Sequence, residues 1–468
     1  RMVRSVSLTV AATAHEGVKI NIVDTPGHPD FVGEVRAGLR AADAALFVVS
    51  AADGIDGITR MLWEECEAVR MPRAVVVTHV DHQRGDFDEV LAVCQRSFGE
   101  GTQPLFLPLL SDDELPAGLI DLLTQKVLDY SKGSKVERDA EPGHLDAIEA
   151  ARTALVEGVI QESEDDALMD LWLEGDEIPP ATLITDLRKA VARAAFHPVL
   201  PVVATNGLGA VELLDLITNA FPPPCARELP VVTTPDGKPR EAVVCDVAQP
   251  LVAEVVKTTT DAYVGRLSLV RIFSGTLTQD ATVHVSGHFA QFAGGNRGRE
   301  DHDVDERLGA VSVPLGGTLN PVPKGIAGDI VAVARLTKAE TGDTLSDPSA
   351  PALMEPWAMP EPLLPTAVVA KTSSDEDKLS QGLGRLVAED PTVRVEVNPD
   401  THQMVLWAMG ESHLDVLLDR LRNRHGVQVD GVPLKVALKE TFQKKATGRG
   451  RHVKQSGGHG QYAVCDIE

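Results

Sequence analysis

The sequence has little cysteine, no long apolar run and a shortage of positive charge, and each shortage excludes a class of protein. The cysteines form no CxxC pair and no metal-ligand spacing, so we expect neither a disulfide framework nor a zinc site. No stretch approaches the roughly 18 apolar residues of a membrane-spanning helix, and no signal-peptide pattern opens the sequence. We therefore expect a cytoplasmic protein without membrane contact, whose thiols stay reduced: Cys66, Cys94, Cys225, Cys245 and Cys465.

Basic residues are outnumbered, with 44 Lys and Arg against 69 Asp and Glu and a net charge of −25. Such a field repels nucleic acid on average, so any RNA contact needs a local basic patch or a protein partner. One such patch is the basic run over residues 444–454. The length of 468 residues indicates several domains, and a hydrophobic content of 43% is ample for their cores.

Strand and helix patterns alternate in the first domain, which we place at residues 1–225. Apolar segments predict strands at 18–23, 45–50, 74–77 and 200–203, with helical patterns such as 86–98 between them. This alternation predicts a parallel, doubly wound α/β sheet, in which strand 45–50 is covered on both faces. An acidic insertion over about 103–197, expected to be mostly helical, interrupts the domain.

Three further units are expected after Pro222-Pro223-Pro224. Short β-patterned segments punctuated by glycine predict a β-barrel over 226–350, followed by a Pro-rich linker. A β-α-β-β-α-β pattern over 361–440 predicts a ferredoxin-like domain, with a capping box of Ser373 and Glu376 opening its first helix. A glycine-rich and basic segment, 441–468, is the expected start of a fourth domain.

The motif with the clearest chemistry is Asp24-Thr25-Pro26-Gly27-His28, directly after a predicted strand. A carboxylate at the carboxyl end of a strand can hold Mg²⁺ through water. A glycine at this point lets the backbone N–H approach a terminal phosphate.

In its full context, residues 20–31, the motif resembles the switch II segment of the elongation factor G family of translational GTPases. Residues 4–9 are similar to switch I of that family, and residues 162–175 to its helical insertion. Further similar segments follow in the family's order, in domains II, III and IV: 260–267, 379–381 with 390–392, 409–414 and 454–462.

The resemblance implies a site for GTP and Mg²⁺. In it, His28 would position the attacking water, while Ser7 and Asp24 would be the metal ligands. The guanine loop of the family reads NKxD but here reads Thr78-His79-Val80-Asp81, which keeps only the aspartate. The implied nucleotide-binding residues are Ser7, Asp24, Thr25, Pro26, Gly27, His28, Thr78, His79, Asp81, Val203 and Ala204.

The sequence contains no GxxxxGK[ST] phosphate loop. In the resembled fold this loop follows a central strand, and two strands would otherwise face an empty slot with unpaired backbone groups. We therefore expect these residues to be part of a longer protein.

The resemblance implies a monomeric factor that hydrolyses GTP when the sarcin–ricin loop and proteins of the ribosome engage it. The altered guanine loop also leaves open a ribosome-binding paralogue with weak or no GTPase activity. A ribosomal-protection type of GTPase is a third reading.

Overall fold

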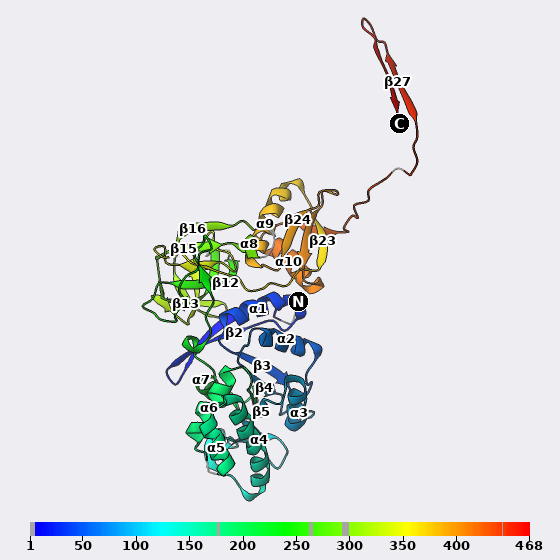
Figure 1. Ribbon diagram of the computed structural model, residues 1–468. Coiled ribbons are helices and arrows are strands. Elements are labelled where there is room, and N and C mark those ends of the chain that lie inside the picture. The colour runs from blue at the N-terminus through cyan, green and yellow to red at the C-terminus, as the bar shows by residue number, and fades with distance from the viewer. Residues whose placement is uncertain (1–4, 176–177, 262–264, 293–298, 442) are drawn as a thin grey trace.

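The computed structural model describes the whole chain except residues 1–4, 176–177, 262–264, 293–298 and 442. Arg4 of the switch I motif and residues 262–264 of the barrel motif therefore lie outside the described part. Figure 1 shows the α/β unit and its insertion at one end, with the barrel and the ferredoxin-like unit at the other. Helix α1 (Val32–Ala41) lies where these units meet.

The parallel sheet of the first unit has the strand order β3-β4-β10-β5. Its central strand β4 is apolar because it is covered on both faces, and residues 74–77 are at most 4% exposed. The helices α2, α3 and α7 complete this unit, whose elements are β3 (Ala45–Ser50), α2 (Gly57–Ala68), β4 (Arg73–Thr78), α3 (Phe87–Phe98), β5 (Thr102–Pro104), β10 (His197–Pro201) and α7 (Ala210–Ala220).

Two expectations about these strands are wrong. Strand β2 (Val18–Asp24) does not join the parallel sheet but pairs antiparallel with β1 (Thr9–His15). Strand β3 is an edge strand with Leu46 and Val48 exposed by 37% and 67%, so it is not covered on both faces. In the described chain β2 and β3 each pair with one strand only.

The insertion is only partly helical. Its first part is an antiparallel meander, and three helices follow it, with α4 and α6 packed side by side. The first three strands of the meander carry short apolar segments that are partly buried, and each strand pairs antiparallel with the next. Its elements are β6 (Phe106–Leu110), β7 (Pro116–Asp121), β8 (Lys126–Asp129), β9 (Val136–Asp139), α4 (Leu145–Ser163), α5 (Asp166–Glu174) and α6 (Pro180–Ala192).

Most of the barrel strands belong to one ten-stranded sheet, and the β1–β2 hairpin is added at its end through β17, whereas β11 pairs separately with β22 and β14 with β19. Alternate residues of β13 and β20 point into a core that is almost wholly buried. The strands are β11 (Val232–Thr233), β12 (Val252–Asp261), β13 (Gly265–Ser274), β14 (Thr276–Thr278), β15 (Thr282–Gly287), β16 (His302–Arg307), β17 (Val311–Leu315), β18 (Thr318–Val322), β19 (Lys324–Ile326), β20 (Ile330–Ala334), β21 (Thr344–Ser346) and β22 (Leu353–Met354), with a short helix α8 (Phe289–Phe292).

The third unit has the sheet order β24-β25-β23-β26 with two helices on it, which is the arrangement of a ferredoxin-like fold. The expected capping box is absent, because Ser373 lies in a 3-10 turn and the helix begins only at Glu376, after Asp375. The elements are β23 (Leu364–Ala370), α9 (Glu376–Glu389), β24 (Arg394–Val397), β25 (Met404–Ala408), α10 (Glu411–Asn423) and β26 (Val429–Val432).

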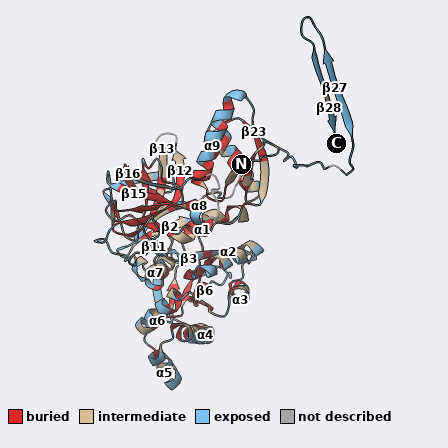
Figure 2. Ribbon diagram, turned by 45° about the horizontal axis from the view of Figure 1, so that its top comes forward, coloured by how far each residue is buried: buried red, intermediate tan, exposed pale blue. Residues whose placement is uncertain are grey.

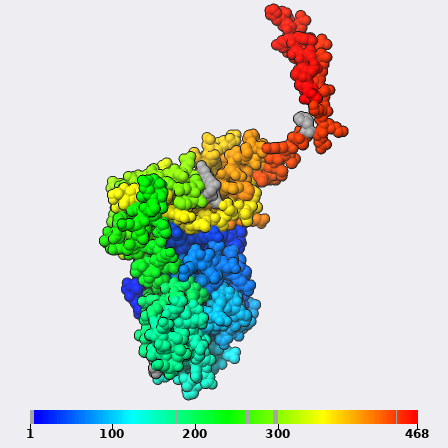
Figure 3. Space-filling view, viewed as in Figure 1, coloured from blue at the N-terminus to red at the C-terminus, as the bar shows by residue number. Residues whose placement is uncertain are grey.

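The last segment is a hairpin of β27 (Gly448–Lys454) and β28 (Gln461–Ile467). It projects from the rest of the molecule on an extended stretch of chain (Figure 3) and is exposed over almost its whole surface (Figure 2). Among the described residues, no helix is both long and apolar enough to cross a membrane.

All five cysteines are free thiols. Cys66 and Cys94 are buried, and burial raises the pKa of each thiol to about 12. These two thiols are therefore protonated at neutral pH.

Candidate functional site

The segment after strand β2 forms the first part of the candidate site. Asp24 ends the strand and is exposed, and its carboxylate forms no hydrogen bond or ion pair with another described residue. A Cβ placed on the exposed Gly27 would meet no atom within 4 Å, so the backbone there is open. A free carboxylate next to an accessible backbone N–H fits Mg²⁺ and a phosphate group.

The imidazole of His28 is oriented by the turn that follows it. His28 caps the 3-10 turn Pro29–Phe31, and its Nδ1 accepts a hydrogen bond of 3.2 Å from the backbone N–H of Asp30. In the neutral ring this contact leaves the proton on Nε2. The side chain is 30% exposed, so Nε2–H can donate to a water molecule.

Asp30 joins this turn to the ferredoxin-like unit. Its Oδ2 accepts hydrogen bonds from the backbone N–H groups of Ser412 (2.9 Å) and His413 (3.3 Å), in the first turn of α10. Asp30 therefore caps a helix of another domain and lies favourably at its positive end. A Cβ on Gly410 would collide with the Asp30 carboxylate, which explains the glycine at this position.

A chain of rings continues from His28 into the same domain. The ring of Phe31 lies 5.9 Å from that of His28 and 5.8 Å, edge-on, from that of His413. His413 Nε2 lies 3.1 Å from Asp390 Oδ2. Burial alone would raise the pKa of Asp390, but hydrogen bonds from His413 and Thr392 outweigh it and hold that pKa far below its usual range. Asp390 is therefore ionised at neutral pH.

The second part of the site lies where the parallel strands β4 and β10 end. The exposed Asp81 follows β4, and its Oδ2 accepts a hydrogen bond of 3.4 Å from Thr205 Oγ1 in the loop after β10. Within that loop Ala204 is exposed and Val203 is buried. The structure therefore brings together both loops that the sequence assigns to guanine binding.

The altered residues of the first loop are Thr78 and His79. Thr78 Oγ1 donates to Val49 O (3.4 Å) and contacts His79 Nδ1 (3.1 Å). His79 is exposed and has a left-handed backbone, with φ of 57°. The hydroxyl thus makes only local contacts, and the imidazole has no long aliphatic stem to cover a base.

We expect the double variant Thr78→Asn/His79→Lys to bind guanine nucleotides about tenfold more tightly than the wild type. The reason is that one restored polar contact contributes about 1–3 kcal/mol. Titration of the full-length protein with a fluorescent GDP analogue measures this. His82→Lys adds the same charge to an exposed residue of this loop and should change nothing. Equal affinity of the double variant and the wild type would show that this account of the loop is wrong.

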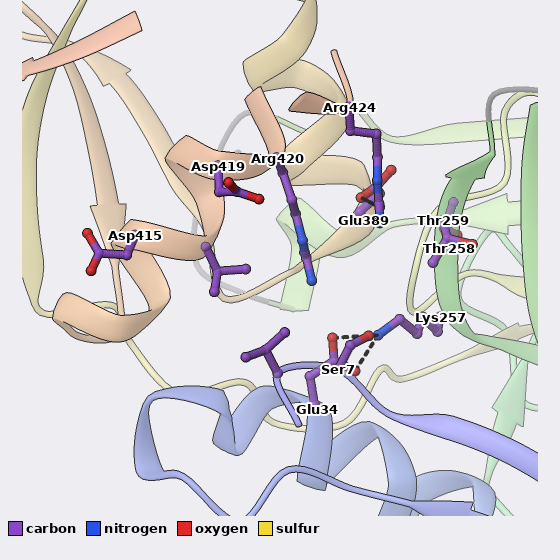
Figure 4. A pocket seen from close by; sticks show the side chains of 12 residues that line it. Ser7, Glu34, Lys257, Thr258, Thr259, Glu389, Asp415, Asp419, Arg420 and Arg424 are labelled. Atoms are coloured by element: carbon purple, nitrogen blue, oxygen red, sulfur yellow. Dashed lines mark hydrogen bonds and ion pairs between the residues drawn. The ribbon is translucent and has the colours of Figure 1, made fainter. Parts of the chain in front are cut away.

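Ser7, the second predicted metal ligand, contacts the barrel in this structure. Its hydroxyl is bound by the ammonium group of Lys257, on barrel strand β12, and not by a group of the Asp24 segment. The same ammonium group lies 2.5 Å from Glu34 of helix α1 (Figure 4). No sequence pattern indicates this contact, because Lys257 and Glu34 are 223 residues apart.

The candidate site therefore consists of two clusters on different sheets. The first follows β2 and holds Asp24, Thr25, Pro26, Gly27 and His28, while the second joins the ends of β4 and β10. Sequence reasoning missed the residues that tie the first cluster and Ser7 to the neighbouring domains, although several belong to quoted motifs: Asp30, Phe31, Glu34, Lys257, Asp390 and His413.

Three family models match successive parts of the chain. They are "Elongation factor Tu GTP binding domain" at residues 3–223, "Elongation factor G domain 2" at 250–348 and "Elongation Factor G, domain III" at 359–432.

Curated relatives and a solved structure match over nearly the whole chain. The chain is 55% identical over 470 residues to the "Elongation factor G-like protein" of two Mycobacterium tuberculosis strains, CDC 1551 / Oshkosh and H37Rv. The matches cover 100% of this chain and 65% of each relative, so the chain spans less than two thirds of their length. A crystal structure of a Thermus thermophilus protein superposes with a TM-score of 0.80 at 30% identity, covering 99% of this chain and 64% of that one.

Proposed function

Because the chain belongs to the elongation factor G-like family of translational GTPases, we propose that the full-length protein is a cytoplasmic, ribosome-associated factor that hydrolyses GTP on the ribosome to drive or modulate translocation. The observation that carries this proposal is the segment after β2. There a carboxylate without a recorded partner, an open glycine backbone and an oriented imidazole follow one another within five residues.

Each group has a defined task in this proposal. Asp24 and, after a rearrangement, Ser7 would hold Mg²⁺, which neutralises phosphate charge. The Gly27 N–H would bind the terminal phosphate, while Asp81 and the backbone N–H of Ala204 would bind the guanine base. The Nε2–H of His28 would orient a water molecule. The remaining site residues would line the nucleotide: Thr25, Pro26, Thr78, His79 and Val203.

A second candidate is a ribosome-binding paralogue with weak or no hydrolysis. The local contacts of Thr78 and His79 favour it, because these side chains replace two that the family uses to hold guanine. In that case the protein would act by occupying the ribosome.

Ribosome binding is supported by the projecting hairpin β27–β28. Its basic residues include Arg449, which lies 3.5 Å from Asp466, and Arg451, which lies over the Tyr462 ring. Both side chains are exposed in a chain that is otherwise acidic, so both can also contact a phosphate backbone.

We expect the full-length protein to co-sediment with ribosomes in the presence of a GTP analogue, and the bound fraction to fall as salt is raised. Arg449→Gln/Arg451→Gln should weaken binding and flatten its salt dependence. Lys126→Gln/Lys132→Gln, which removes the same charge from the distant insertion meander, should not. A protein that never pellets with ribosomes, even at low salt, would contradict the proposal.

A further inference from the structure

The contact between Ser7 and Lys257 has a consequence for the reaction cycle. Lys257 lies on β12 between Val256 and Thr258, each 1% exposed, so its backbone is firmly held by the barrel. Its side chain is 11% exposed and that of its partner Glu34 is 13% exposed. The ammonium group binds both carboxylate oxygens, at 2.6 and 2.5 Å, and also donates to the Ser7 hydroxyl.

Glu34 fixes the neighbouring residue as well. Its Oε2 accepts a hydrogen bond of 2.9 Å from the backbone N–H of Leu8, and the Leu8 side chain is buried among residues of α1 and the barrel. The Lys257–Glu34 pair therefore holds the chain at two points, the Ser7 side chain and the Leu8 backbone. Because Leu8 is anchored independently of Ser7, the hydroxyl can leave Lys257 without displacing strand β1.

There is room for that movement. A cavity of about 580 Å³ lies between the three domains and is lined by Val6, Ser7, Glu34, Lys257 and residues of α10 (Figure 4). Val6 and Ser7 are only half-buried, and Ser5 is exposed. Residues 5–7 can therefore change conformation without opening a packed core.

The two possible partners of the Ser7 oxygen exclude each other. An ammonium group and a Mg²⁺ ion on one hydroxyl oxygen would bring two cations within a few ångströms in a partly buried site, and the single negative charge of Glu34 offsets only part of their Coulomb repulsion. We propose that Lys257 is a positioning residue that holds the Ser7 hydroxyl off the metal, so that Ser7 becomes a metal ligand only when it exchanges Lys257 for Mg²⁺. This rests on the proposed function, in which a bound nucleoside triphosphate with Mg²⁺ recruits Ser7.

The exchange makes the barrel a participant in nucleotide discrimination. A triphosphate that recruits Ser7 must break the Lys257 contact, whereas a diphosphate that does not recruit Ser7 leaves it in place. Lys257 therefore weakens triphosphate binding relative to diphosphate binding. By linkage, a bound triphosphate frees Lys257 to interact with Glu34 alone and so alters the contact between α1 and the barrel.

The test uses the double variant Lys257→Met/Glu34→Gln in the full-length protein. It removes the Lys257–Glu34 ion pair and leaves neither charge without its partner. We expect the ratio of affinities for a non-hydrolysable GTP analogue and for GDP to rise about tenfold, the scale of one charge-assisted hydrogen bond. The Mg²⁺ concentration that half-saturates analogue binding should fall. Lys257→Gln/Glu34→Gln, whose amides can still form hydrogen bonds, should act in the same direction and decides the matter if the first variant unfolds.

The matched control is Lys19→Met/Asp329→Asn. This pair, 2.6 Å apart, joins strand β2 to the barrel but does not contact Ser7, so the affinity ratio should stay at the wild-type value. An unchanged or lower affinity ratio in a folded Lys257→Met/Glu34→Gln protein would overturn the role of Lys257. A wild type that binds neither nucleotide would instead contradict the proposed function.

Discussion

His28→Ala is expected to reduce ribosome-stimulated GTP hydrolysis at least about 100-fold, the scale of a lost positioning group, while leaving GTP affinity almost unchanged. The ring is held by the N–H of Asp30 and has Nε2 free for a water molecule, so its contribution is orientation and not ground-state binding. Single-turnover phosphate release with and without ribosomes, for wild type and variant, measures this effect.

A structural cause must be separated from a catalytic one in that experiment. Phe31→Leu is the matched control, because it removes the ring beside His28 but leaves the imidazole and its hydrogen bond. It should retain most of the stimulated rate. A His28→Ala protein that hydrolyses GTP as fast as a stimulated wild type would show that the switch II assignment is wrong.

Arg40→Ala is expected to destabilise the contact between α1 and the barrel by about 3–5 kcal/mol, the cost of leaving a buried charge unpaired. Arg40 Nε lies 2.5 Å from Glu254 Oε2, and the Glu254 side chain is fully buried. Burial raises the pKa of Glu254, and Arg40 opposes that rise. Denaturant unfolding of the full-length protein should show the loss in its first transition.

The stability of the Arg40→Ala variant should also depend on pH in a defined direction. Without Arg40 the pKa of Glu254 rises further in the folded state, so the folded protein binds a proton that the unfolded protein lacks. The variant should therefore regain stability as the pH falls towards the unfolded pKa of about 4.5. Arg40→Ala/Glu254→Leu should recover much of the loss. Arg36 lies on the same helix as Arg40 and pairs with Glu65 of α2, and this pair is more exposed. Arg36→Ala should therefore cost at most about 1 kcal/mol.

The fold class and the family resemblance expected from the sequence are confirmed. Strand 74–77 could be predicted because a short, uninterrupted apolar segment is typical of a buried strand. The ferredoxin-like unit could be predicted because its helices show the helical periodicity and its hairpin the strand periodicity of apolar residues. The partner of strand β2 could not be predicted in this way. Periodicity shows that a segment is a strand but does not show which edge it joins.

The residues of the candidate site show the same division. Asp24 to His28 and Asp81 are recognisable because their motifs are contiguous and their backbone geometry is local. The surroundings of Ser7 could not be recognised from the sequence, because its partner Lys257 lies 250 residues away in another domain. Similarly, Asp30 caps α10 across 382 residues, and no local pattern in either segment indicates the contact.

The most direct test of the central claim is single-turnover phosphate release from GTP by the full-length wild-type protein, with and without ribosomes. A translational GTPase with an oriented His28 should release phosphate slowly alone and much faster with ribosomes. A rate that ribosomes do not change, in a protein that still binds them, would contradict the GTPase account and favour the ribosome-binding paralogue.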